Sequence, residues 1–182
     1  ETVARRAADL AAERGCPRDL VLAPSVSFGA SDHHLPFGGT LSLRAETLLA
    51  VLLDLARSIH AVGGRRLVVV NGHGGNRGIC SAAVAAASTR NPGLQAAYLD
   101  YWSLSDEGGP HVPGHAGVFE TSLALAVEPD LVRAAEERPA PPVMPTVERG
   151  ELAEFVLDIF ADLADNVGRV VARLLLDERF RL

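Results

Sequence analysis

The stretch RLVVVNGHGGN, residues 66–76, constrains the fold of this chain more than any other. Its apolar run at 67–70 is mostly β-branched, which is typical of a parallel strand buried on both faces. The run is followed by one histidine, His73, among three glycines, which permit sharp turns and close approach of the backbone. Because ligands bind at the carboxyl ends of parallel strands, we expect His73 to stand at a ligand-binding edge.

Helical and strand-like patterns alternate along the rest of the chain. Apolar periodicity predicts helices at 3–14, 46–62, 77–89, 119–127 and 150–176, and strands at 20–28, 67–70 and 94–102. Glycines at the ends of the first two helices are typical stop signals, and residues 136–145, which hold four prolines, predict a loop. Alternating elements of these lengths predict one α/β domain over residues 1–182, with a mainly parallel sheet.

Composition excludes several functions. All 17 basic residues are arginine, so Schiff-base chemistry and a P-loop lysine are absent, and the net charge of −6 argues against a nucleic-acid partner. No apolar run reaches the roughly 18 residues that a membrane span needs, and no secretory signal pattern opens the sequence. Cys16 and Cys80 have neither disulfide nor metal-site spacing. We therefore expect reduced, unpaired thiols in a cytoplasmic protein.

The glycine-rich turn at residues 71–76 allows three interpretations. A phosphate cradle is one, although Arg77 stands where the last glycine of a dinucleotide-binding pattern belongs. A tight strand-to-helix turn with a merely structural histidine is the second. The third makes His73 a metal ligand or a catalytic imidazole.

A second polar cluster lies in PHVPGHAGVFETS, residues 110–122. His115 comes five residues before Glu120, and a helix begins at about Phe119. A carboxylate in the first helical turn is stabilised by the helix dipole, so Glu120 is either a simple helix-end charge or a functional group. Two imidazoles and a carboxylate in strand-end loops favour a hydrolytic metal site.

A third cluster lies in GASDHHLPFGGTLSL, residues 29–43, directly after the predicted strand at 20–28. If this segment is extended, His33 and His34 point to opposite faces and cannot both reach one site. A surface loop with hydrogen-bonded histidines is the simpler alternative. We expect the three clusters to meet at one edge of the sheet.

The pieces SDHHLPFGGTLSL, NGHGGN, YLDYW, GHAGVFETSLAL with EPDLV, and VERGEL resemble the creatininase family, or creatinine amidohydrolases, in the family's order. The resemblance implies a three-layer αβα sandwich, commonly hexameric, with two divalent metal ions. Zinc, manganese and iron all suit such ligands. It also implies hydrolysis of a C–N amide bond.

Site residues follow from the same resemblance, position by position. It implies that His73 is a metal ligand and that Glu120 is a metal ligand or catalytic group beside it. His115 matches a general acid/base. Three further positions are expected to contact the substrate: His34, Trp102 and His111.

Departures from the family pattern bear on the substrate. Creatininase has a bulky residue and a ligand glutamate where this chain has Gly74 and Gly75, and a pocket tryptophan where it has His111. We therefore expect a small or cyclic amide other than creatinine. A creatininase-type peptidase, like the one that trims the mycofactocin precursor, and a non-catalytic homologue are the alternatives.

The family's Glu-x-His turn and bridging aspartate have no counterpart after Glu1. Either these three ligands precede Glu1, or the protein has lost its metal site. With His73 and Glu120 alone as ligands, we expect residues 1–182 to hold no tight metal. The apolar surface of residues 151–176 exceeds one helical face, which predicts a homo-oligomer, with a hexamer favoured.

Overall fold

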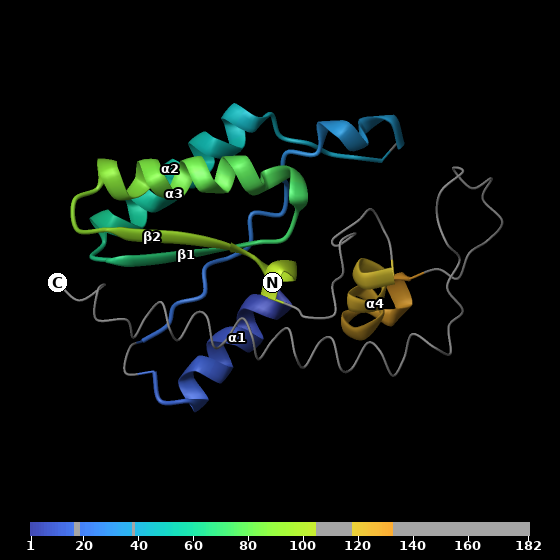
Figure 1. The fold of residues 1–182 in the computed structure, drawn as a ribbon, viewed down its shortest axis with the longest axis horizontal. Helices are drawn as coiled ribbons and strands as arrows, with labels where there is room; N and C mark the ends of the chain where they lie inside the picture. Colours follow the sequence, from blue (N-terminus) through green and yellow to red (C-terminus); the bar gives the residue numbers. More distant parts are fainter. Residues whose placement is uncertain (17–18, 38, 105–117, 133–182) are drawn as a thin grey trace.

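A computed structural model of the chain describes residues 1–16, 19–37, 39–104 and 118–132 (Figure 1). Its longer elements are listed in chain order: α1 (Thr2–Glu13), α2 (Ala45–Ala61), β1 (Arg66–Asn71), α3 (Arg77–Arg90), β2 (Gln95–Asp100) and α4 (Val118–Val127). The described residues also form four short 3₁₀ helices: η1 (Asp32–Phe37), η2 (Gly74–Asn76), η3 (Tyr101–Leu104) and η4 (Pro129–Leu131).

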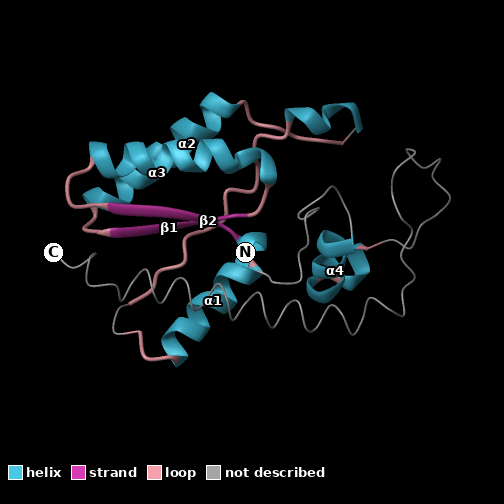
Figure 2. Ribbon diagram, viewed as in Figure 1, coloured by secondary structure: helices cyan, strands magenta, loops and turns pink. Residues whose placement is uncertain are grey.

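Strands β1 and β2 pair in parallel, with Arg66 opposite Gln95 and Asn71 opposite Asp100. Figure 2 shows α2 and α3 together on one side of the two strands and α1 on the other side. Because the strands run in the same direction, their carboxyl ends lie at one edge. Elements η2 and η3 both start at that edge.

Small side chains pack α2 and α3 onto the sheet. Ala56 of α2, Ala87 of α3 and Leu94 form a buried cluster. Along α3, Cys80, Ala83 and Ala87 are buried at the helical spacing of three and four residues. Short side chains at these positions let the two helices lie close to each other and to β2.

Predicted helix boundaries agree with the structure to within a residue or two. Helices α1, α2, α3 and α4 occupy the ranges that periodicity indicated, and Gly15 and Gly63 follow α1 and α2 with φ of 76° and 97°. Only glycine adopts this backbone conformation readily, and the Gly63 N–H donates to the His60 carbonyl at 3.0 Å. The glycine stop signals are therefore confirmed.

The strand prediction for residues 20–28 is wrong. These residues form no strand, and Val21 and Phe28 are 93% and 49% exposed. An apolar run becomes a strand only where a neighbour satisfies its backbone groups, and among the described residues the sheet consists of β1 and β2 alone.

Two further strand predictions need smaller corrections. Strand β2 ends at Asp100, and Tyr101 and Trp102 turn into η3, where the Ser103 hydroxyl donates to the Asp100 carbonyl at 2.7 Å. Strand β1 is only partly buried from residue 66 to residue 70, and Asn71 alone is fully buried. The expectation of a strand buried on both faces does not hold in the described part of the chain.

Several predictions fall outside the described residues: the loop at 136–145, the helix at 150–176 and the oligomer predicted from residues 151–176. In the described part, no helix has the length and apolarity needed to cross a membrane. Cys16 and Cys80 are both unpaired thiols, as their spacing predicted.

Candidate metal centre

Three imidazoles converge at the edge of the sheet. His33 and His34 come from η1, and His73 comes from the turn between β1 and η2. One ring nitrogen from each of the three lies within 4.8 Å of the others. The rings of His33 and His73 are stacked at 5.4 Å with an interplanar angle of 10°, and the ring of His34 meets His73 edge-on at 5.5 Å.

The conformation of residues 32–37 explains how adjacent histidines reach one site. An extended segment would point the two side chains in opposite directions, but residues 32–37 form the 3₁₀ helix η1. With three residues per turn, neighbouring side chains diverge by about 120° rather than 180°. The rings of His33 and His34 therefore lie 4.0 Å apart and share a side of the helix.

Hydrogen bonds between distant segments hold η1 against the glycine-rich turn. The Ala30 N–H donates to Asn76 Oδ1 at 2.9 Å, and the Ser31 hydroxyl lies 3.1 Å from His73 Nε2. The Ser31 N–H in turn donates to the Ser42 hydroxyl at 2.8 Å. These contacts confirm the expected meeting of residues 29–40 with residues 71–76.

Gly75 is required by this close approach. A Cβ atom at this position would lie 2.5 Å from the Ala30 carbonyl oxygen, 2.7 Å from His73 Nε2 and 3.0 Å from His33 Cε1. The neighbouring Gly72 has no such neighbours within 4 Å. Of these two glycines, Gly75 is the one that makes room for the imidazoles.

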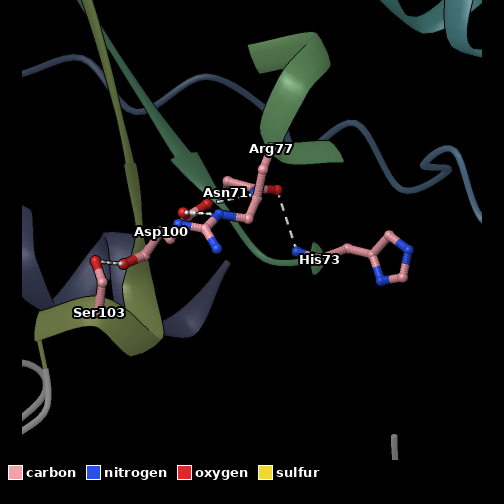
Figure 3. A network of polar contacts seen from close by, with 5 residues as sticks. All are labelled: Asn71, His73, Arg77, Asp100 and Ser103. Carbon is pink, nitrogen blue, oxygen red and sulfur yellow. Dashed lines mark hydrogen bonds and ion pairs between the residues drawn. The ribbon is translucent and has the colours of Figure 1, made fainter. Parts of the chain in front are cut away.

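A buried polar network fixes the backbone of His73 (Figure 3). The His73 N–H donates to Asn71 Oδ1 at 3.1 Å, and Asn71 Nδ2 donates to Asp100 Oδ1 at 2.7 Å. The second oxygen of Asp100 pairs with Arg77 Nε at 2.8 Å. Figure 3 shows the imidazole of His73 directed away from this network.

Glu120 follows Phe119 in α4, and Phe119 packs against the aromatic residues of η3. Tyr101 stacks on Phe119 at 6.0 Å and meets Trp102 edge-on at 5.3 Å. Burial raises the pKa of Tyr101 to about 12, and the charge of Glu120 adds to this effect. The expected role of Glu120 as a metal ligand or catalytic group stays a prediction.

The other predicted site residues are placed unevenly. Trp102 is 6% exposed and packs with Phe119 in a small core, so its expected contact with substrate stays a prediction. His111 and His115 lie outside the described residues, and their expected roles stay predictions. Asn71 and Asp100 were not among the predicted site residues. Each is the polar last residue of a mostly apolar strand, which is the signal that could have marked them.

The three imidazoles fit a divalent metal ion. Zinc–nitrogen bonds of about 2.0–2.1 Å place tetrahedral ligand atoms roughly 3.4 Å apart, so a bound ion would draw the three ring nitrogens closer together than the 4.8 Å within which they lie. Three neutral imidazoles with an open fourth position make a coordination set that catalytic zinc accepts. Among the described residues, the site therefore offers more than the two ligands expected from the sequence.

Comparison with known families identifies the chain. The family model described as creatinine amidohydrolase (Creatininase) matches residues 1–168. The chain belongs to the creatininase family. A mycofactocin precursor peptide peptidase of Mycobacterium ulcerans is 37% identical over 143 residues, which cover 76% of this chain and 54% of that protein. Creatinine amidohydrolase of Pseudomonas putida is 37% identical over 132 residues, covering 62% of this chain and 49% of that protein.

Solved creatininase structures share the fold. A crystal structure of creatinine amidohydrolase superposes with a TM-score of 0.73 at 25% identity, covering 96% of this chain and 80% of that one. A mutant creatininase of the Zn–Zn type has a TM-score of 0.73 at 24% identity, covering 96% and 81%. A manganese creatininase has a TM-score of 0.68 at 23% identity, covering 100% and 81%. The α/β sandwich expected from the resemblance is thus confirmed.

This creatininase-family chain spans about half the length of the curated relatives it matches. In its described residues, His33, His34 and His73 form a group of side chains that could hold a metal ion. The assignment to the family does not depend on how many metal ligands these residues supply, because the family model matches residues 1–168.

Proposed function

We propose that the whole protein is a metal-dependent hydrolase that cleaves a C–N amide bond. The observation that carries the proposal is the convergence of His33, His34 and His73 at the carboxyl edge of a parallel sheet. The zinc and manganese of creatininase structures with this fold support the kind of metal, and we propose two divalent ions in the whole protein.

We propose His73 as a metal ligand, with Glu120 as a second ligand and with His33 and His34 as additional imidazoles. The ring of His33 lies beside Gly75, the position at which the resemblance places a ligand glutamate in creatininase. An imidazole there would restore a donor that glycine cannot supply. The resemblance instead implies that His34 contacts the substrate, and metal titration of a His34→Ala variant separates the two roles.

A divalent cation bound there would polarise the amide carbonyl and lower the pKa of a coordinated water from about 15.7 toward about 7. Glu120 would orient that water for attack on the carbonyl carbon. When the C–N bond breaks, His115 would donate a proton to the departing nitrogen, a contribution typically worth about 10²–10⁴ in rate. The products are a carboxylic acid and an amine.

Two substrate classes remain within this reaction. The sequence motifs favour a small or cyclic amide other than creatinine. The 37% identity to a mycofactocin precursor peptide peptidase over 76% of this chain favours a peptide, since the creatinine amidohydrolase match covers only 62%. Hydrolysis assays of the full-length protein with short peptides and with cyclic amides, side by side, decide between them.

Metal analysis of the full-length protein tests the proposal. His73→Ala should lower metal content and abolish hydrolysis while the protein stays folded. His60→Ala is the matched control. The His60 ring lies in the last turn of α2, 3.0 Å from the Pro92 carbonyl oxygen, so this substitution should leave metal content and hydrolysis unchanged. Negligible metal content in the wild type would favour the non-catalytic alternative, and unchanged metal content in His73→Ala would show that His73 is not a ligand.

A further inference from the structure

Asn71 and Asp100 form a buried pair at the ends of the two strands. They stand directly opposite each other in the parallel register and are 3% and 5% exposed. Buried polar groups are stable only where their hydrogen-bonding capacity is used. The Asn71 amide uses both its oxygen and its nitrogen, on the His73 N–H and on Asp100 respectively.

The charge of Asp100 determines which way the Asn71 amide faces. In the reversed orientation the amide oxygen would face the Asp100 carboxylate, and the amide nitrogen would face the His73 N–H. Both contacts would be repulsive, and a bond to a charged acceptor is roughly twice as strong as a neutral one. Asp100 therefore presents the Asn71 oxygen to the backbone of His73.

Arg77 pairs with one oxygen of Asp100 and leaves the other to Asn71. The guanidinium pairs with Asp100 Oδ2 at 2.8 Å, while Oδ1 accepts from Asn71. The Arg77 side chain is 62% exposed and begins α3, so the start of that helix is joined to the ends of both strands. A buried carboxylate with this partner costs less than one left alone.

We propose that Asn71 and Asp100 are positioning residues for the metal centre. By holding the His73 N–H, they fix the extended backbone of His73, with φ of −145° and ψ of 130°, from which its ring reaches His33 and His34. This inference rests on the proposed function, because it assigns the pair an effect on metal affinity. Neither side chain belongs to the group of His33, His34 and His73.

The experiment measures zinc affinity of the full-length protein by competition with a chelator. Asn71→Ala removes the acceptor for His73, and Asp100→Asn keeps the side-chain size but removes the orienting charge. We expect both to weaken zinc binding about 10–100-fold. Asn91→Ala is the matched control. The Asn91 side chain is buried just after α3 and donates to the Ala87 carbonyl at 2.8 Å, so the zinc affinity of this variant should not change.

A second measurement keeps the inference separate from the proposed metal centre. In the metal-free protein, exchange of the His73 amide hydrogen should be slow, and Asn71→Ala should speed it about tenfold relative to the Val70 amide. Wild-type zinc affinity in Asn71→Ala and Asp100→Asn would overturn the inference.

His73→Ala shows which proposal has failed. If the His73→Ala variant also binds zinc like the wild type, the proposed metal centre is wrong. Amide exchange alone then decides whether Asn71 and Asp100 position His73. In that case, fast exchange of the His73 amide in the wild type overturns the positioning role. Slow exchange in the wild type that becomes fast in Asn71→Ala supports it.

Discussion

Substitution of Gly75 by alanine is the sharpest test of how the metal centre is built. The new Cβ would lie 2.5 Å from the Ala30 carbonyl oxygen and 2.7 Å from His73 Nε2. The first contact is with backbone, which cannot rotate away, so residues 29–31 must shift. That shift strains the bond from the Ala30 N–H to Asn76 Oδ1. Overpacking of this kind typically costs about 1–3 kcal/mol.

Urea unfolding of the full-length protein measures this cost. With a denaturant slope of about 2 kcal/mol/M, a loss of about 1–3 kcal/mol moves the midpoint down by roughly 0.5–1.5 M. Zinc affinity should fall as well, because the displaced loop carries His33 and His34 away from His73.

Gly72→Ala is the matched control, in the same turn. A Cβ at Gly72 has nothing within 4 Å outside its chain neighbours, and its φ lies outside the left-handed region. The free energy of unfolding of Gly72→Ala should change little or rise by up to about 1 kcal/mol, because alanine restricts the conformations of the unfolded chain. Equal stability and equal zinc affinity in the two variants would refute the claim that close packing at Gly75 shapes the site.

Three further predictions follow from helix propensity and from the burial of Tyr101 and Cys80. Gly78→Ala in α3 meets no atom within 4 Å and should raise the free energy of unfolding by about 0.8–1 kcal/mol through helix propensity, measured by urea unfolding. Because the folded pKa of Tyr101, about 12, exceeds the ordinary value of 10, the unfolded chain loses this proton first. Stability should therefore fall between about pH 10 and pH 12, and Tyr101→Phe should reduce the fall. Burial, with a smaller effect of Asp100, raises the pKa of the Cys80 thiol, so a thiol reagent at pH 8 should label Cys16 well before Cys80.

Local sequence patterns determined most of the described elements. Apolar periodicity and glycine stop signals located α1 and α2, and the apolar run at 67–70 located β1. These signals depend only on residues close together in the sequence. The motif around His73 also indicated a functional strand-end turn and, with the other motifs, the creatininase family. These features needed no knowledge of which segments touch.

Tertiary contacts decided the rest. Whether residues 20–28 become a strand depends on a partner that periodicity cannot reveal. His33 and His34 share a site with His73 because η1 turns through a 3₁₀ helix and Asn76 holds Ala30 across 46 positions of sequence. The pairing of Asn71 with Asp100 depends on strand register, which is set by two segments together. The sequence thus determined which residues could carry the chemistry, and only long-range packing decided which of them meet.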